Sequence, residues 1–332
     1  MDVSIIIVNY RSADLIIDCV RAVKEKTEGV SYEIIVVDNA SGDDSVKMLQ
    51  KVLGEEIRLV CAGENLGFGK ANNLGAKYAQ GTYLFFLNPD TILINNAVAV
   101  LVKYLRENPK TGIAGGNLYS IDGRESSSYC LEFDDMKTVR RASGWGNIIW
   151  EQTAAWVRRH VKNEEQLRTL AYKETFNSSG KPLEVAYIFG TDMMLSRNLF
   201  QEVKGFDPDF FMYAEEEELS WRISQKGWKI VSVPEAKIIH LDGGTFKHSE
   251  SLNSQQYEMR LTGIMVYYTK RYGHTGASQF YHYKMLRLKR QNKLAKLLNR
   301  GMLAELTENQ IACLEKVGSN VWRQGKTGKE TA

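Results

Sequence analysis

Two groups of side chains in this sequence have the types and spacing that metal-assisted group transfer needs. The first is Asn88-Pro89-Asp90, which places an amide oxygen and a carboxylate two residues apart. Oxygen ligands of this kind suit a hard divalent cation that also touches phosphate oxygens. The second is the run of four carboxylates from Glu215 to Glu218. Their mutual repulsion should raise the pKa of at least one member, which suits a general base.

Both groups also have a purely structural interpretation. Asn-Pro-Asp is typical of β-turns, and acidic residues in a first helical turn are stabilised by the helix dipole. Four adjacent carboxylates exceed what a helix start requires. The turn and the metal-ligand interpretations of Asn88 to Asp90 both stay open at this point.

The elements that must position Asn88 and Asp90 are predicted from apolar runs. Tyr83 to Leu87 is apolar or aromatic throughout, which is typical of a strand buried on both faces. Pro89 has no N–H, so the strand should end before it. Further buried strands are expected at 3–8, 33–37 and 57–61, with amphipathic helices between them. This alternation predicts an α/β fold with a doubly wound, mostly parallel sheet flanked by helices.

Polar residues follow the ends of four predicted strands: Asn9, Asp38, Asn65 and Asp90. Open α/β sheets bind ligands at the carboxyl ends of their strands, so we expect these side chains along one edge. An Asp at a strand end can accept hydrogen bonds from a base N–H or from ribose hydroxyls, although a turn-forming role for Asp38 is the alternative.

Two common nucleotide-binding loops are absent from the sequence. After Gly67-Phe68-Gly69 the third glycine of the dinucleotide fingerprint is missing. Gly69-Lys70 is followed by Ala71, whereas the Walker loop requires Ser or Thr there. A nucleotide ligand would therefore be held by other loops.

Several motifs, in the same order, resemble those of the family 2 inverting glycosyltransferases, and most of all its rhamnosyltransferase-like branch. They are Ile7-Val8-Asn9-Tyr10, Val36-Val37-Asp38-Asn39-Ala40-Ser41, Asn65-Leu66-Gly67-Phe68-Gly69 with Asn72-Asn73-Leu74-Gly75, and Asn88-Pro89-Asp90. The resemblance covers about residues 3 to 245. It implies a GT-A fold, a nucleotide-diphosphate-sugar donor (a dTDP- or UDP-sugar) and a divalent metal, Mg²⁺ or Mn²⁺.

The resemblance also implies roles for individual residues. The residues expected to bind the donor are Asn9, Tyr10, Asp38, Asn65, Asn72, Asn88 and Asp90. The expected metal ligands are Asp90, Asn88 and His240, with Asn88 standing where the wider family has an acidic residue. Glu216 takes the position of the family's catalytic base, and Glu215 is its rival one residue earlier.

These features predict an inverting transferase that moves a sugar to a hydroxyl of a glycan or lipid-linked glycan acceptor, in cell-surface polysaccharide synthesis. A retaining route would need an enzyme nucleophile, for which the sequence offers no candidate. One alternative is a nucleotidyltransferase, but its Gly-rich loop is missing from Asn9-Tyr10-Arg11-Ser12. The other is a non-catalytic nucleotide- or glycan-binding module, against which Asp90 and Glu216 argue.

The domain organisation follows from the change of pattern along the 332 residues. Residues 1–245 are predicted to form the transferase domain, with a nucleotide-binding half at about 1–95 and an acceptor half at 96–245. Residues 246–332 should form a helical C-terminal extension. Within it, Thr307-Glu308-Asn309-Gln310 resembles a capping box that opens a last short helix ending near Gly318.

Composition and charge limit the partners and the location. A formal net charge of +3 does not argue for nucleic acid. No apolar run reaches 18 residues and the first strand is expected from residue 3, so a cytoplasmic protein is expected. The segment 284–300 holds seven basic residues and no acid. It is either a solvated helix or a peripheral contact with the inner face of the cytoplasmic membrane.

Overall fold

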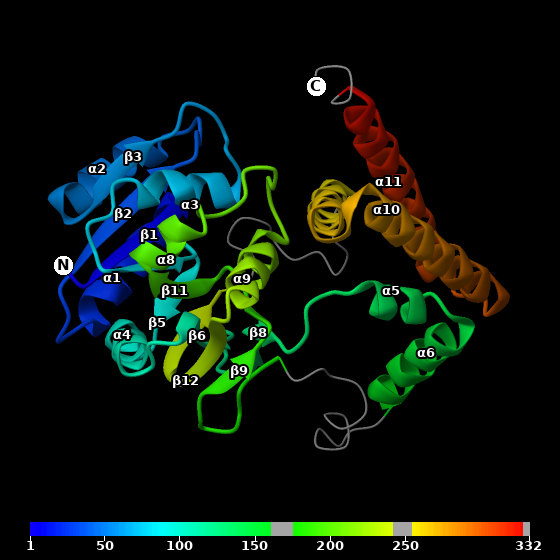
Figure 1. Ribbon diagram of the computed structural model, residues 1–332, viewed down its shortest axis with the longest axis horizontal. Coiled ribbons are helices and arrows are strands. Elements are labelled where there is room, and N and C mark those ends of the chain that lie inside the picture. Colours follow the sequence, from blue (N-terminus) through cyan, green and yellow to red (C-terminus); the bar gives the residue numbers. More distant parts are fainter. Residues whose placement is uncertain (161–174, 242–253, 328–332) are drawn as a thin grey trace. The chain divides into compact units, whose positions relative to one another are not determined.

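The computed structural model describes residues 1–160, 175–241 and 254–327 (Figure 1). Its elements are, in chain order, β1 Val3–Asn9, α1 Ala13–Lys26, β2 Tyr32–Asp38, α2 Ser45–Leu53, the 3₁₀ turn Gly54–Glu56, β3 Arg58–Cys61, α3 Phe68–Ala76, β4 Tyr83–Leu87, β5 Thr91–Leu93, α4 Ala97–Glu107, β6 Thr111–Tyr119, β7 Glu125–Ser126, β8 Tyr129–Cys130, α5 Met136–Ala142, α6 Trp145–His160, β9 Leu183–Val185, β10 Tyr187–Ile188, β11 Asp192–Ser196, α8 Arg197–Glu202, α9 Glu215–Gln225, β12 Lys229–His240, α10 Ser254–Leu297 and α11 Gly301–Thr327.

A ten-stranded mixed sheet runs in the order β3-β2-β1-β4-β11-β6-β12-β5, with β7 beside β6 and β9 beside β12. β1 pairs in parallel with β2 on one side and with β4 on the other, so the sheet extends from β1 in both directions. β11 enters between β4 and β6 and is antiparallel to both. The predicted α/β fold, a doubly wound sheet flanked by helices, is confirmed. The sheet, predicted as mostly parallel, is mixed, because β11, β5, β7 and β9 pair in the antiparallel direction.

Each central strand buries alternate side chains on the two faces of the sheet. In β1, Ile5 and Ile7 belong to a core shared with α1, α2 and α4, whereas Ile6 belongs to one shared with α3, α8 and α9. In β4, Phe85 and Phe86 divide in the same way. Because both faces are covered, the strands appear in the sequence as continuous apolar runs.

The sheet register fixes which residues meet at the carboxyl edge of β1, β2 and β4. Asn9 and Asp38 are direct partners at the ends of β1 and β2. Leu87, the last residue of β4, pairs with Asp192, the first residue of β11. Since β11 is antiparallel, the residues that precede it lie at the same edge as Asn88.

Strand β12 is longer than the sequence indicates and carries His240 to this edge. Pro234 by itself would end a strand at Val233, but β12 continues to His240 across a register shift between Ser232 and Lys237. Proline lacks a ladder donor, so it fits in a sheet at such an irregularity. Beyond the shift, His240 pairs with Thr91 of β5.

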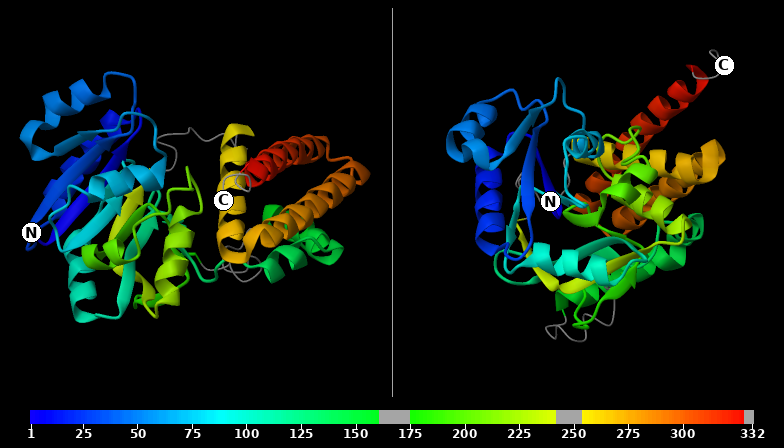
Figure 2. Two further views of the ribbon diagram at one scale, coloured as in Figure 1. Left: turned by 45° about the horizontal axis from the view of Figure 1, so that its top comes forward. Right: turned by 60° about the vertical axis from the view of Figure 1, so that its left-hand side comes forward.

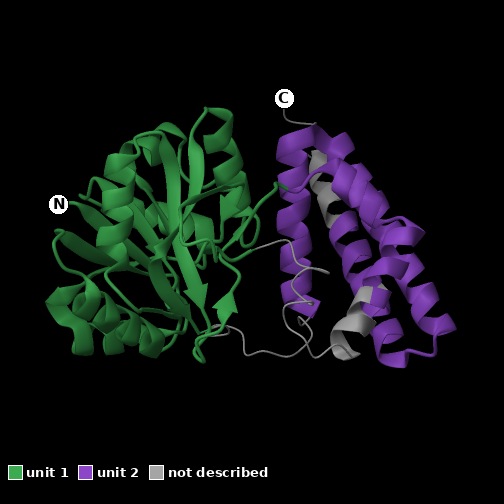
Figure 3. Cartoon of the chain, turned by 90° about the horizontal axis from the view of Figure 1, so that it is seen from below, with its two compact units in different colours: residues 1–133, 173–248 green, residues 134–172, 249–332 purple. Residues whose placement is uncertain are grey.

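The chain forms two compact units (Figure 3). Unit 1 comprises residues 1–133 and 173–248, and unit 2 comprises residues 134–172 and 249–332. The predicted helical C-terminal region is confirmed, and α5 and α6 group with it. A folding boundary at residue 245 stays a prediction.

The helices of unit 2 differ in detail from the expected pattern. α10 changes direction at Gly273, where φ is +69°, and its yellow and orange parts point in different directions in Figure 2. The expected capping box at Thr307 is wrong, because α11 already begins at Gly301. The Thr307 hydroxyl instead donates to the carbonyl of Leu303 at 2.9 Å inside the helix. Among the helices of the described residues, none has the length and apolar character to cross a membrane.

Candidate active site

The ends of β1 and β2 are joined by a buried polar network. Asn9 Nδ2 donates to Asp38 Oδ1 at 2.7 Å and to Ser41 Oγ at 3.1 Å. The Ser41 hydroxyl donates to the same Asp38 oxygen at 2.6 Å. The backbone N–H and the hydroxyl of Ser12 both donate to Asn9 Oδ1, each at 3.1 Å. Asn9 is therefore engaged at both ends of its amide and acts as the brace that orients Asp38.

Two further observations concern the loop after β1. The hydroxyl of Ser12 makes no capping bond to α1, although its position before the helix is typical of a cap. Arg11 adopts a left-handed backbone with φ of +56° and donates from Nε to the Ser41 carbonyl at 2.9 Å. Its guanidinium lies 5.3 Å from the ring centroid of the half-buried Tyr10. The loops after β1 and β2 thus form one joined surface.

The loop after β3 is fastened by Asn39, a residue that the sequence reasoning did not single out. Asn39 Nδ2 donates to Asn65 Oδ1 at 3.0 Å and to the Gly67 carbonyl at 3.2 Å. The Leu66 N–H donates back to Asn39 Oδ1 at 2.8 Å. Asn39 stands next to Asp38 in the motif that carries the resemblance, so its position was a usable signal.

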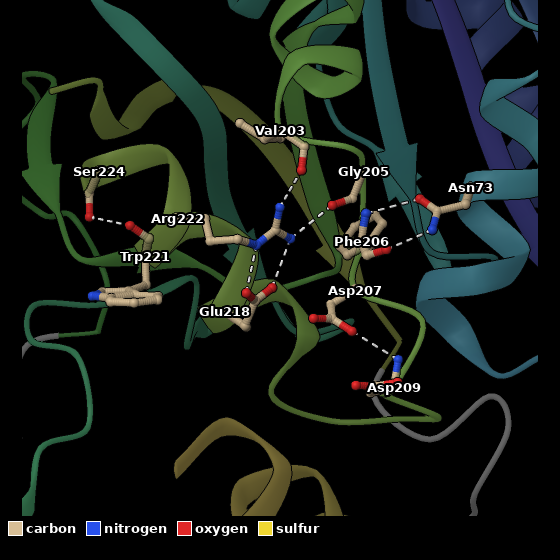
Figure 4. A network of polar contacts seen from close by, with 10 residues as sticks. All are labelled: Asn73, Val203, Gly205, Phe206, Asp207, Asp209, Glu218, Trp221, Arg222 and Ser224. Atoms are coloured by element: carbon tan, nitrogen blue, oxygen red, sulfur yellow. Dashed lines mark hydrogen bonds and ion pairs between the residues drawn. The ribbon is translucent and has the colours of Figure 1, made fainter. Parts of the chain in front are cut away.

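The predicted donor residue Asn72 and its neighbour Asn73 lie on α3 and face different partners. Asn72 is buried, and its Nδ2 donates to the Phe68 carbonyl at 3.1 Å within the helix. Asn73 exchanges two hydrogen bonds with the backbone of Phe206, at 2.8 and 2.9 Å (Figure 4). Asn73 thereby ties α3 to the loop that leads into α9.

Asp90 and His240, both predicted as metal ligands, are 150 residues apart in the sequence but lie together at the sheet edge. His240 Nε2 lies 3.4 Å from Asp90 Oδ1, and both side chains are mostly buried. The Leu241 N–H donates to the Asp90 carbonyl at 2.8 Å, which fixes the backbone of this loop against the end of β12. Asn88 is half-buried, and its N–H donates to the Thr191 carbonyl at 2.9 Å.

The chemistry of this donor set fits a hard divalent cation completed by a diphosphate. Among the described residues, His, Cys, Asp and Glu form no cluster of three or more that could hold a metal by themselves. Asp90 and His240 with the amide oxygen of Asn88 make a small set. Mg²⁺ is usually held by one or two carboxylates together with substrate phosphates, rather than by an all-protein cage.

Asp192 is a buried acid at the same edge that the sequence reasoning missed. It is fully buried, and one carboxyl oxygen accepts a 2.5 Å hydrogen bond from the Gly116 N–H. Burial raises the pKa of Asp192 to about 8, although the Gly116 N–H and the nearby His240 lower it in part. The residue lies within a long apolar run, so local pattern did not distinguish it from the strand around it.

The four glutamates occupy the first turn of α9 and are not equally accessible. Glu215, Glu217 and Glu218 are buried, whereas Glu216 is half-buried. Burial, reinforced by the adjacent Glu216, raises the pKa of Glu215 well above its usual value. Within the described residues, Glu215 Oε2 has no hydrogen-bond partner. Glu215 is therefore a buried acid with a raised pKa beside the more accessible Glu216.

Glu216 lies at the carboxyl edge of the sheet. A Cβ added to Gly190 would lie 4.0 Å from the Cβ of Glu216. Gly190 directly precedes Thr191, whose carbonyl accepts from Asn88 at 2.9 Å. The chain of neighbours Asn88, Thr191 and Gly190 therefore links the Asn-Pro-Asp loop to Glu216.

Glu218 has a structural partner instead. Its two carboxylate oxygens accept from Arg222 Nε and Nη2 at 2.6 and 2.8 Å. Arg222 also donates to the carbonyls of Val203 and Gly205, as Figure 4 shows. The bidentate pair lies within α9 and holds the Arg222 guanidinium in place. The bonds from Arg222 to Val203 and Gly205 then tie α9 to the loop before it.

The backbone entering α9 is strained. Tyr213 and Ala214 have φ values of +73° and +70°, in the left-handed region that non-glycine residues rarely adopt. Each such residue costs roughly 1–3 kcal/mol and persists only where its surroundings hold it. Strain of this kind is concentrated at functional sites, which agrees with a specific role for the first turn of α9.

Comparison with known proteins identifies the family. The sequence model described as Glycosyl transferase family 2 matches residues 4–203, more than half of the chain. The chain belongs to glycosyl transferase family 2. A second model, Glycosyl transferase family group 2, matches residues 126–303. The resemblance stated from the motifs is confirmed.

Relatives within family 2 include two named rhamnosyltransferases. One is an N-acetylglucosaminyl-diphospho-decaprenol L-rhamnosyltransferase of Mycobacterium tuberculosis, 26% identical over 219 residues, which are 62% of this chain and 66% of that enzyme. The match thus spans just under two thirds of the mycobacterial enzyme. The other is the rhamnosyltransferase WbbL of Escherichia coli, 25% identical over 245 residues, covering 72% of this chain and 83% of that protein.

Solved structures share the fold at low sequence identity. A mannosyltransferase of Pyrobaculum calidifontis in complex with GDP-Man and Mn²⁺ superposes with a TM-score of 0.57 at 15% identity, covering 95% of this chain and 86% of that one. GalNAc-T7 with UDP, GalNAc and Mn²⁺ gives a TM-score of 0.54, also at 15% identity, over 97% of this chain and 57% of that one. These likenesses confirm the GT-A type fold of this family 2 member.

A cavity of about 500 Å³ in unit 1 of this family 2 member lies away from the predicted site. Its lining comes from around α3 and α8 and includes Lys70, Lys77, Arg197 and Lys204. The residues predicted to hold donor, metal or acceptor proton do not line it. The candidate active site is therefore the open sheet edge rather than this cavity.

Proposed function

We propose that the chain is an inverting, metal-dependent glycosyltransferase. It moves a sugar from a dTDP- or UDP-sugar to a hydroxyl of a glycan or lipid-linked glycan in cell-surface polysaccharide synthesis. The observation that carries the proposal is that Asp38 ends β2, Asp90 follows the end of β4 and Glu216 lies near Gly190, just before β11. All three therefore lie along the carboxyl edge of one sheet, in a chain that belongs to family 2. The rhamnosyltransferase relatives support a deoxyhexose as the sugar.

Asp38 and the loop of Asn9 and Tyr10 would receive the base and ribose of the donor. The bonds from Asn9 and Ser41 to Asp38 support this assignment, because they already hold the carboxylate in one orientation. Binding a nucleotide then costs no further side-chain entropy at Asp38. Asn65 borders the same surface through its bond to Asn39. Asn72 has a bond within α3 and would act mainly by supporting that helix.

Asp90, Asn88 and His240 would hold Mg²⁺ or Mn²⁺ against the donor diphosphate. When bound, such an ion supplies positive charge that offsets the charge developing on the leaving nucleotide diphosphate. The solved relatives that contain Mn²⁺ support this choice of cofactor.

Glu216 would take the proton of the acceptor hydroxyl. As the proton leaves, the acceptor oxygen forms a bond to the anomeric carbon from one face. The bond from that carbon to the diphosphate oxygen breaks on the other face, and its electron pair leaves with the nucleotide diphosphate. A single in-line displacement inverts the configuration. Greater accessibility supports Glu216 over Glu215, whose carboxyl is buried.

A thermal-shift series tests the donor and metal assignment. A nucleotide sugar at one hundred times its dissociation constant should stabilise the protein by about 2.7 kcal/mol. We expect this shift for the correct donor with Mn²⁺, and we expect Asp90→Ala to lose most of it together with most of the turnover. The matched control is Asp18→Ala, on an exposed position of α1. An unchanged donor affinity of Asp90→Ala, with and without Mn²⁺, would contradict the metal role.

A further inference from the structure

The turn between α10 and α11 in unit 2 presents three large apolar side chains to solvent. Met302 is 88% exposed, Leu297 is 72% exposed and Leu298 is 51% exposed. These residues lie within six positions of one another at one end of a helical hairpin. Such a concentration of exposed apolar surface is unlike the isolated exposed side chains that are normal on proteins.

This turn, which we call the hairpin tip (residues 297–302), is an ordered structure. Asn299 adopts the left-handed backbone with φ of +53°, as is common where a helix ends. The Arg300 N–H donates to the Ala295 carbonyl at 2.9 Å, and the Asn299 N–H donates to the Lys296 carbonyl at 3.2 Å. These are the two bonds of a Schellman motif. The apolar side chains of the tip are thus held outward by a defined turn.

Contacts between the two helices hold the tip from behind. Asn292 Nδ2 on α10 donates to the Ala304 carbonyl at 2.8 Å and to the Thr307 hydroxyl at 2.9 Å on α11. Farther along α11, Lys316 Nζ donates to Glu258, in the part of α10 before the bend at Gly273, at 2.7 Å. The hairpin therefore has its own interhelical bonds, and exposure of the tip does not result from a missing partner helix.

Exposed lysines border the apolar tip on the side of α10, whereas at the start of α11 Glu308 pairs with Lys296 at 2.6 Å. Lys289, Lys293 and Leu297 follow one another at four-residue spacing, which places them on the same side of α10. Both lysines are exposed. Farther back, Arg287 pairs with Glu151 at 2.9 Å, and Arg290 lies 5.6 Å from the ring centroid of Trp145. The exposed lysines Lys289 and Lys293 therefore lie on the part of α10 that leads to the tip.

We propose that the hairpin tip is a docking site for an anionic lipid surface. Leu297, Leu298 and Met302 enter the interface between headgroups and acyl chains, and Lys289 and Lys293 contact the headgroups. An apolar group bordered by Lys or Arg has the chemistry of interfacial attachment to anionic lipids. A second copy of the chain is a poor occupant, because like charges would meet around only three apolar side chains, whereas a stable dimer buries roughly 800 Å² per partner.

Docking to lipid is a function separate from sugar transfer, so lipid binding can be measured without donor or acceptor. Vesicles of phosphatidylcholine, with and without phosphatidylglycerol, are cosedimented with the full chain. We expect binding to the anionic vesicles and little to the neutral ones. The double variant Leu297→Glu/Met302→Glu should lower the partition coefficient at least tenfold, since each removes an inserted apolar side chain. Lys289→Gln/Lys293→Gln should lower it roughly fivefold per residue.

The matched control is Ile121→Glu, which changes a side chain that is 69% exposed in unit 1. It should bind vesicles as the unaltered chain does. Equal partition of the unaltered chain and the tip variant would overturn the proposal. So would a dimer in solution that the tip variant dissociates, without vesicle binding by either form. Circular dichroism melts confirm that each variant is folded, so neither result can be attributed to unfolding.

Discussion

Glu215 to Glu218 are adjacent in sequence but have four different surroundings. A helix turns by about 100° per residue, so four consecutive side chains point in four directions. Glu218 pairs with Arg222, and Glu217 lies near Tyr187, where burial and then Glu217 raise the pKa of the tyrosine. Glu215 is buried, and its Oε2 atom has no hydrogen-bond partner among the described residues. Only their packing in the fold separates the candidate base from its neighbours.

The first prediction concerns Glu216. Glu216→Gln keeps the shape and removes the proton acceptor, so kcat should fall by roughly 10²–10⁴, the usual worth of general-base catalysis. The affinity for the donor should change little, because this residue is assigned to the acceptor. Steady-state kinetics with separate donor titrations measure both quantities.

Two of its neighbours provide matched controls for that experiment. Glu215→Gln replaces a buried acid by an amide of the same shape at a position that the acceptor cannot readily reach, so kcat should change much less. Glu218→Gln should lower the free energy of unfolding by roughly 3 kcal/mol, because Arg222 loses its charged partner. A large kcat loss at Glu215 with little at Glu216 would place the base one residue earlier.

At the scale of elements, local pattern predicted what local interactions determine. The strand Tyr83–Leu87 has the expected bounds, because a continuous apolar run followed by Pro89 specifies them. In the same way, the helix Ala97–Glu107 ends two residues before Pro109. The approach of His240 to Asp90 depends on β12 pairing with β5 beyond a bulge, and no local signal reports that pairing. Asp192 was missed for the same reason, since only the assembled sheet buries it beside His240.

The second prediction tests how the loop after β3 is seated. Gly67 has φ of +78°, and a Cβ there would lie 1.9 Å from the Phe211 carbonyl oxygen. Gly67→Ala should therefore separate this loop from the chain entering α9 and reduce both activity and stability. Gly123 has the same φ of +78° with nothing within 4 Å of an added Cβ.

The pair of glycine variants separates strain from collision. Gly123→Ala should cost about 1 kcal/mol of unfolding free energy, through backbone strain alone. Gly67→Ala should cost several times more, as measured by urea denaturation. Equal losses in the two variants would mean that Phe211 gives way and that the close approach has no structural importance.

The third prediction concerns Lys284 on α10. Burial, followed by the nearby positive charges of Arg287 and Arg260, lowers the pKa of Lys284 to about 8, although Asp134 and Glu151 raise it in part. Below pH 8 both folded and unfolded chains carry this proton, so the full penalty of the buried charge applies. Between about pH 8 and 10.5 the unfolded chain binds more protons, so this group makes stability rise with pH.

Lys284→Met should consequently be more stable than the unaltered chain at pH 7, by at most about 3 kcal/mol. That advantage should shrink between pH 8 and 10.5. Urea denaturation followed by circular dichroism at several pH values measures it. Lys289→Met, at an exposed position of the same helix, should show no such pH-dependent difference. A constant difference for Lys284→Met across this range would exclude a titrating buried amine.

At the scale of the whole molecule, unit 2 is built from two separate stretches of chain. Tyr267 and Tyr268 on α10 donate to the carbonyls of Asp134 and Asp135 at 3.4 and 3.3 Å. Arg287 bonds Glu151 on α6 at 2.9 and 3.0 Å. The sequence placed residues 134–172 in the acceptor half, because contacts across more than a hundred residues leave no local pattern. A single boundary near residue 245 would therefore separate residues 134–172 from the rest of unit 2.

The fourth prediction follows from that discontinuity. A chain ended at residue 248 keeps α5 and α6 but loses every partner they have on α10, so apolar surface such as Ile148, now buried, should be exposed. We expect this truncation to aggregate in size-exclusion chromatography.

A second truncation, in which a flexible linker also replaces residues 134–172, should instead stay monomeric and melt in one cooperative transition. It should still be stabilised by the donor with Mn²⁺ if the sheet edge alone binds it. A monomeric, cooperatively melting first truncation would show that α5 and α6 do not need the C-terminal helices, and it would favour the simple boundary near residue 245.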